Sequence, residues 1–448
     1  MIALGVFAPL KGSADEASLR AEITRLQQEN ADLRAQLAQC DGQANSKDSD
    51  ILSLVRKLAQ QQSDVASLVL GLGGGPLILP EALLRSVVPN EYIILLADSP
   101  EQANTRQQVA AAFGIDEQAV LHVYEQALSG FAARLSSAER DRIEARSDVL
   151  GLARNGRVFS TGVAHKELRV GLAQPVLKRP VAAHAEQIDV YLFDTGIRRA
   201  HRDLQGRVNA AGFSFFDNGI AGEDCAGHGT HVAARIAGNR LGVSKAAQLT
   251  SVKVIDRFGT GDVATVIAGI DWVMGQSGAQ KLVNMSLTRM VTEAPSPLDI
   301  AVNALIESGA IVVAAAGNAA ADAGDFTPAR VAGVITVGSA VGAQLSDFSN
   351  AGEAVDIYAP GEAVLSASIR DICGVQEMSG TSMAAPFVTG IVADLLAAGT
   401  APQDMRPALR TQATRYETGA FAGEIERFVL DDVDTANDVL CVAETRVE

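Results

Sequence analysis

From residue 188 to residue 337, short apolar runs rich in β-branched residues alternate with stretches whose apolar residues recur at helical spacing. Helical periodicity covers residues 262–274 and 298–308. Strands that alternate with helices in this way are typical of a parallel sheet with helices on its faces. The sequence therefore predicts an α/β domain. The expected strands are 188–193, 249–255, 282–287, 311–316 and 334–337.

Polar residues follow two of these runs at the point where each predicted strand ends. Asp194 comes directly after residues 188–193, and Asn318 comes shortly after residues 311–316. Open α/β sheets place their sites outside the carboxyl ends of the strands. We therefore expect Asp194 and Asn318 to lie at a functional site.

A serine and a histidine complete a catalytic set. Ser382 stands in the motif Gly-Thr-Ser-Met-Ala-Ala-Pro, and His228 stands in Gly-His-Gly-Thr-His. A serine hydroxyl is a weak nucleophile, so an imidazole must take its proton and a carboxylate must hold that imidazole. We therefore predict that Ser382, His228 and Asp194 act together. Asn318 is the candidate donor to the oxyanion that develops on the attacked carbonyl.

At these residues the chain resembles the subtilisin-like serine proteases, and within them the proteinase K branch. The order Asp, His, Ser separates this family from the chymotrypsin-like and α/β-hydrolase orders. Four family motifs occur in order, starting at residues 194, 227, 315 and 380, and the resemblance covers roughly 163–435. It implies a serine endopeptidase that acts on proteins or peptides through an acyl-enzyme intermediate.

The resemblance also implies a substrate-binding set. In the family, the strand that holds Ser286 and Leu287 pairs with the substrate backbone, and two glycines usually follow. This chain has Thr288 and Arg289 there instead, so we expect a pocket that disfavours bulky aromatic residues before the cut, and we expect Arg289 to face solvent. Gly317 joins Ser286, Leu287 and Thr288 as an implied substrate-binding residue.

Residues 89–160 are predicted to form a separate small domain. Its elements follow the order β-α-β-β-α-β, a split βαβ sandwich. Capping boxes predict that its two helices begin at Ser99 and Ser136. The expected strands lie near 92–96, 119–124, 130–135 and 149–153.

Residues 129–135 resemble the matching strand of subtilisin-family propeptides. The resemblance implies that this domain assists folding, inhibits the catalytic domain and lays its C-terminal tail in the active site. The chain would then be a zymogen that processes itself, and we expect the cut between Ser160 and Ala164.

The extension 1–88 is predicted to consist of a helical segment and a glycine-rich linker at 71–75. Its heptads favour a parallel two-stranded coiled coil and hence a precursor homodimer. An amphipathic helix that packs within the chain, or a loosely ordered arm, stays open as an alternative. The heptad residues are Leu19, Leu26 and Leu33 at position d and Ile23, Asn30 and Leu37 at position a, and the register resumes at 51–68.

Composition excludes several function classes. The net charge of −16 argues against binding nucleic acid or anionic membranes. The sequence contains no run of 18 apolar residues, so it predicts no membrane span. The apolar residues 1–10 lack the basic leading segment of a typical signal peptide, while the resemblance implies a secreted or periplasmic enzyme. The pairing of the four cysteines stays open, namely Cys40, Cys225, Cys373 and Cys441.

Three other interpretations are weighed against the serine endopeptidase. Asp-Thr-Gly also marks aspartic proteases, but these need two such loops and this chain has one. His228 and His231 could bind a metal ion, but no third ligand is evident. We therefore predict no metal site and no cofactor for catalysis. The calcium-binding aspartate of proteinase K-like relatives is missing around 339–342, which leaves a structural calcium ion elsewhere as an open question. A catalytically weak subtilase-fold binding or scaffold protein is the remaining alternative.

Overall fold

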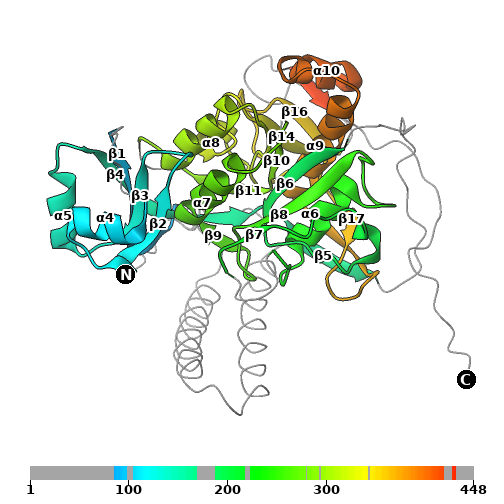
Figure 1. The fold of residues 1–448 in the computed structure, drawn as a ribbon. Helices are drawn as coiled ribbons and strands as arrows, with labels where there is room; N and C mark the ends of the chain where they lie inside the picture. Colours follow the sequence, from blue (N-terminus) through cyan, green and yellow to red (C-terminus); the bar gives the residue numbers. More distant parts are fainter. Residues whose placement is uncertain are drawn as a thin grey trace, which may run out of the picture. The chain divides into compact units, whose positions relative to one another are not determined.

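The computed structural model describes residues 85–97, 104–168, 187–216, 222–278, 280–291, 294–341, 344–417 and 426–429 (Figure 1). The heptad residues and the capping box expected at Ser99 lie outside these ranges. Among the helices of the described ranges, none combines the length and the apolar character that crossing a membrane requires. Cys225 is free and exposed, whereas Cys373 is disulfide-bonded.

The large sheet of the catalytic domain confirms the predicted parallel α/β fold. Its strand order is β19-β20-β16-β14-β12-β10-β6-β8-β7, and every neighbouring pair from β20 to β7 is parallel. Each of the five expected runs contributes a strand. The bounds are β6 Ile188–Asp194, β7 Phe213–Ser214, β8 Ala247–Lys253, β10 Leu282–Met285, β12 Ile311–Ala315, β14 Ile335–Val341, β16 Ile357–Pro360, β19 Thr414–Glu417 and β20 Glu426–Val429.

Helices cover both faces of this sheet, which explains why its strands are continuous apolar runs. Leu192 of β6 packs in one core cluster with residues of α6 and α9, and its neighbour Phe193 packs in the other with residues of α7 and α8. Figure 1 shows α7 and α8 on one side of β6 and β10, with α6 and α9 on the other. The bounds are α6 His228–Ala237, α7 Val263–Met274, α8 Pro297–Glu307, α9 Thr381–Ala397 and α10 Met405–Gln412.

The small domain has the predicted order β-α-β-β-α-β, and its antiparallel sheet runs β4-β1-β3-β2. The capping box expected at Ser136 is present before α5. Helix α4, however, begins at Arg106, where Thr105 and Gln108 form the capping box. The bounds are β1 Val87–Leu96, α4 Arg106–Phe113, β2 Val120–Tyr124, β3 Gly130–Arg134, α5 Ser137–Glu144 and β4 Val149–Ser160.

Strand β4 is longer than the 149–153 expected from sequence, because its second half pairs with the catalytic domain. Its first half pairs with β1. Its second half lies between β9 (Thr260–Asp262) and β11 (Leu287–Met290), antiparallel to both. After β4 the chain continues into β5 (Val163–Leu168), which pairs with β18 (Val375–Ser379). The small domain's last strand therefore leads the chain through the predicted catalytic site.

Candidate active site

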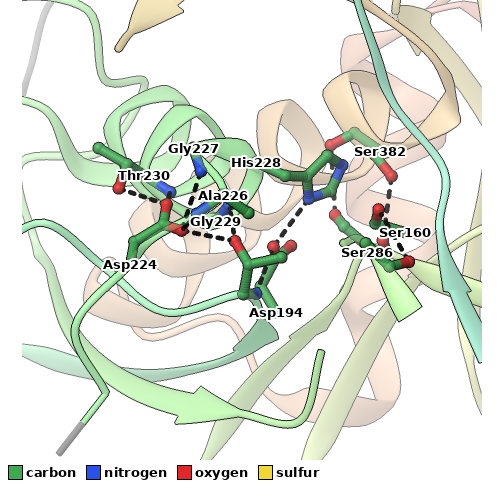
Figure 2. A network of polar contacts seen from close by, with 12 residues as sticks. Ser160, Asp194, Asp224, Ala226, Gly227, His228, Gly229, Thr230, Ser286 and Ser382 are labelled. Atoms are coloured by element: carbon green, nitrogen blue, oxygen red, sulfur yellow. Dashed lines mark hydrogen bonds and ion pairs between the residues drawn. The ribbon is translucent and has the colours of Figure 1, made fainter. Parts of the chain in front are cut away.

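Asp194 and His228 form a buried pair. Strand β6 ends at Asp194, whose side chain is 1% exposed, and helix α6 begins at His228. The Nδ1 atom of His228 lies 2.7 Å from Oδ1 of Asp194, and the same oxygen accepts a hydrogen bond from the Thr195 backbone N–H at 2.7 Å. Figure 2 shows His228 between Asp194 and Ser382. A carboxylate on Nδ1 leaves Nε2 as the free base of a neutral imidazole.

Asp224 holds the start of α6 in place, a role that the sequence analysis missed (Figure 2). Its buried carboxylate accepts five hydrogen bonds. One of them comes from the hydroxyl of Thr195, in the loop after β6, and the same hydroxyl accepts a hydrogen bond from the Gly229 N–H of α6 at 2.9 Å. Burial raises the pKa of Asp224, and hydrogen bonds from Gly227 and Thr230 oppose that shift. The five donors are Thr195 Oγ1, Ala226 N, Gly227 N, Thr230 N and Thr230 Oγ1, at 2.6 to 2.9 Å.

His231 is a packed helix residue. Its Nε2 donates toward the carbonyls of Val364 at 3.0 Å and Gln376 at 3.2 Å, so it ties α6 to β17 (Val364–Ala367) and β18. Burial lowers the pKa of His231 to about 3, which keeps the ring neutral near pH 7. Within the described ranges, no group of three or more His, Cys, Asp or Glu residues is arranged to hold a metal ion.

Ser382 is the second residue of α9, and the helix follows Gly380, a position that has no room for a side chain. Gly380 has a φ of +152°, and a Cβ built there would lie 1.9 Å from the carbonyl oxygen of Thr161. Pro386 lacks the N–H that would bond to the Ser382 carbonyl four residues earlier. The Ser286 hydroxyl donates to that carbonyl instead, at 3.2 Å, so the proline helps to bind the helix to the cleft.

The Ser382 hydroxyl points to the uncut chain and not to the histidine. It donates to the Ser286 carbonyl at 3.0 Å, accepts from the Thr161 N–H at 3.0 Å and contacts the Thr161 hydroxyl. Nε2 of His228 is buried and has no hydrogen-bond partner among the described residues. A rotation of the Ser382 side chain is therefore needed before His228 can take its proton. Catalytic hydrogen bonds often tighten only in the reacting complex.

Asn318 donates to one particular carbonyl. Its Nδ2 lies 2.6 Å from the oxygen of Thr161, and the Ser382 backbone N–H lies 3.4 Å from the same oxygen. The other end of the amide is held, since Asn318 Oδ1 accepts from the N–H and the hydroxyl of Thr381 at 2.9 and 2.8 Å. The Thr161 carbonyl thus occupies the position of a carbonyl under attack.

The tail of the small domain lies in the cleft like an extended substrate. Phe159 pairs with Thr260 on one side and with Thr288 on the other. The Thr161 N–H donates to the Ser286 carbonyl at 3.4 Å. Gly162 follows, and a Cβ built on it would lie 2.8 Å from Nε2 of His228.

The four expected substrate-binding residues meet at this cleft. Ser286 and Leu287 contact the tail through their backbones, and Leu287 pairs with Ser160. Thr288 is fully buried, and its hydroxyl oxygen would lie 3.4 Å from a Cβ built on Gly317. Thr288 and Gly317 are therefore neighbours in the structure.

The expectation that Arg289 faces solvent is wrong. Arg289 is 8% exposed, its Nε donates to the Met290 carbonyl at 3.2 Å, and its guanidinium lies against Gly156 of β4. Sequence could not reveal this because β4 comes from the other domain. Elsewhere in the catalytic domain, Arg235 and Phe387 pack on each other, since the Arg235 guanidinium lies 4.8 Å from the Phe387 ring centroid.

Contacts between the two domains extend beyond the cleft and were missed by the sequence analysis. Asp271 of α7 accepts three backbone N–H bonds from the turn after β2, at 2.6 to 3.0 Å. Asn155 of β4 caps the start of α7, where its Oδ1 accepts from Ala264 N–H at 2.9 Å, and the Tyr124 hydroxyl donates to the Ala264 carbonyl at 3.1 Å. The hydrophobic periodicity and motifs of one domain carry no information about which residues of the other domain it contacts, so sequence reasoning could not have found these contacts.

Two family models match the chain. Residues 186–428 match the model described as the subtilase family, and residues 91–159 match the one described as peptidase inhibitor I9. These ranges fall within the expected domains 163–435 and 89–160.

Curated relatives and a solved structure are similar to this chain over 46% to 81% of its length. "Alkaline serine exoprotease A" of Vibrio alginolyticus is 32% identical over 81% of this chain and 72% of its own length. "Subtilase-type proteinase psp3" of Schizosaccharomyces pombe is 34% identical, over 71% and 76%. "Extracellular serine proteinase" of Thermus sp. (strain Rt41A) is 41% identical, over 46% and 50%. A solved cold adapted subtilisin-like serine proteinase aligns with a TM-score of 0.51 and 36% identity, over 56% of this chain and 90% of its own.

Proposed function

Because this chain belongs to the subtilase family and carries a peptidase inhibitor I9 domain, we propose that it cuts its own precursor between Thr161 and Gly162. It is a serine endopeptidase made as a zymogen. The observation that carries the proposed cut is the Thr161 carbonyl, which receives hydrogen bonds from Asn318 Nδ2 and Ser382 N–H beside the Ser382 hydroxyl. Among the described residues, we find no contact that favours the alternative of a catalytically weak scaffold.

The proposed reaction uses four groups of this chain. Ser382 Oγ turns from the Ser286 carbonyl toward His228, gives its proton to Nε2 and bonds to the Thr161 carbonyl carbon. The resulting oxyanion is held by Asn318 Nδ2 and the Ser382 N–H, while Asp194 stabilises the imidazolium. His228 then gives the proton to the Gly162 nitrogen as the peptide bond breaks. Water, activated by the same imidazole, releases the acyl group from Ser382.

We propose that this reaction needs no cofactor. The hydroxyl of Ser382 is the nucleophile, the imidazole of His228 transfers both protons, and two N–H donors stabilise the negative charge, so every step has a protein group. A structural calcium ion would act on stability and takes no part in these steps.

The maturation site is the first prediction. N-terminal sequencing of the mature enzyme should return Gly162. A Gly162→Val precursor should process about 10 to 200-fold more slowly, since even the Cβ of the new side chain would lie only 2.8 Å from His228 Nε2. A mature N-terminus other than Gly162, with normal processing of the variant, would contradict the proposed cut.

Thr288 supplies the second prediction. Its β-branched side chain on the cleft wall should favour small residues before the cut, and the chain's own residue there is Thr161. Replacing Thr288 with glycine should raise the ratio of kcat/KM for Phe over Ala at that position by about 10 to 200-fold. A peptide library measures this ratio. A strong preference for Phe or Tyr in both enzymes would refute a role for Thr288.

We propose that the enzyme is secreted or periplasmic and that two precursor chains pair, and each proposal has its own support. Secretion is supported by the disulfide at Cys373, since disulfides persist in oxidising compartments, and by the extracellular relative in Thermus. Pairing of two precursors is supported by the heptads of 19–68, in which Cys40 falls on position d and would face its own copy.

The third prediction tests that pairing. Light scattering at micromolar concentration should show a dimeric precursor, because the leucines at position d and the residues Ile23, Asn30 and Leu37 at position a would bury against a second copy. The mature enzyme, which has lost residues 1–161, should be monomeric. A monomeric precursor would favour the alternative of a helix that packs within its own chain.

A further inference from the structure

We propose that Arg289 forms a subsite that selects glycine at the sixth residue before the cut bond. The inference rests on the proposed cut, which makes Thr161 the first residue and Gly156 the sixth. It assigns a role in recognition to a residue that the sequence alone placed in solvent.

The register of the strands brings Arg289 to Gly156. Thr288 pairs with Phe159 in the antiparallel pair of β11 and β4, so the next residue of β11 lies opposite Val158 and shares a face with it. Residues two apart on a strand lie on the same face, and long side chains reach the diagonal neighbour. The diagonal neighbour of Arg289 on that face is Gly156.

The guanidinium occupies the space that a side chain at position 156 would need. A Cβ built on Gly156 would lie 1.1 Å from Nη1, 2.0 Å from Cζ and 2.7 Å from Nη2 of Arg289. Gly156 is buried beneath it. Any residue other than glycine therefore requires Arg289 to move.

Moving Arg289 has a cost. The side chain is 8% exposed and its Nε donates to the Met290 carbonyl at 3.2 Å, so a displaced guanidinium loses a hydrogen bond from a charged donor in a buried place.

A substrate of sufficient length would pass the same point. Strand β9 pairs with β4 as far as Arg157, which pairs with Asp262, so the cleft holds an extended chain up to the fifth residue before the cut. The sixth residue follows directly and meets Arg289. The subsite should therefore act on other substrates as well as on the precursor.

Self-processing of the full-length precursor is the first test. Gly156→Val should slow the cut by about 10 to 200-fold, and adding Arg289→Gly should restore most of the rate by opening the space. Gly151→Val is the matched control, because Gly151 lies in the same strand and a Cβ there meets nothing within 4 Å. A control variant as slow as Gly156→Val would overturn the inference.

Peptide hydrolysis by the mature enzyme is the second test, and it does not depend on folding of the small domain. Two peptides are compared that differ only in Gly or Val at the sixth residue before the cut. The wild-type ratio of kcat/KM should be about 10 to 200 in favour of Gly, and the Arg289→Gly ratio should fall close to 1. Equal ratios in both enzymes would overturn the inference, whereas failure to cut either peptide would overturn the proposed function itself.

Discussion

Replacing Ser382 with alanine should lower the peptidase rate by about 10⁴-fold or more, and the full-length chain should accumulate uncut. The hydroxyl that contacts Thr161 is the nucleophile that attacks the peptide bond in the proposed reaction, so its loss removes the acyl-enzyme route. His228→Ala and Asp194→Ala should have effects of the same order, since Asp194 holds His228 at 2.7 Å. Double variants should lose little more than single ones, because the three groups act as a unit.

The measurement combines processing on gels with rates on a short peptide. Ser308→Ala is a matched control, because Ser308 ends helix α8 and its hydroxyl bonds only locally, to the Leu305 carbonyl at 2.7 Å. A fluorophosphonate should label the wild-type enzyme at Ser382 and leave the alanine variant unlabelled. Retained peptidase activity in Ser382→Ala would show that another residue is the nucleophile.

Replacing Asn318 with alanine should lower kcat by about 10² to 10³-fold; this magnitude was measured for the corresponding donor in subtilisin, a relative of this chain. The Nδ2 atom lies 2.6 Å from the Thr161 oxygen, and its hydrogen bond strengthens as negative charge develops on that oxygen. KM should change little, because the interaction is gained mainly in the transition state.

Asn318→Asp separates catalysis from structure. The aspartate keeps an oxygen that can accept from the Thr381 N–H and hydroxyl, as Oδ1 does at 2.9 and 2.8 Å. It replaces the donor to Thr161 with a second oxygen, so kcat should fall at least as far as in Asn318→Ala. An aspartate variant with near wild-type kcat, or an alanine variant that changes only KM, would exclude Asn318 as the oxyanion donor.

Much of the fold could be predicted because its signals are local. Continuous apolar runs such as 188–193 are buried on both faces by helices, so their composition alone indicates central strands. The box at Ser136 and Glu139 is complete within four residues and correctly starts α5. The start of helix α4 was harder to predict, since Thr105 and Gln108 form a box six residues after Ser99 and the helix begins there.

The sequence by itself was enough to predict the protease family, the Asp, His, Ser order, the candidate asparagine donor and the inhibitory domain that precedes them. Each of these predictions rests on short motifs, and the residues of one motif are neighbours in the sequence. Only the tertiary structure decided which peptide bond lies in the site, where the Ser382 hydroxyl points and that Arg289 is buried against Gly156. These features arise where β4 enters the cleft between β9 and β11. Contacts between segments so far apart in the chain leave no periodicity or spacing in either segment, so they exist only once the two domains are packed together.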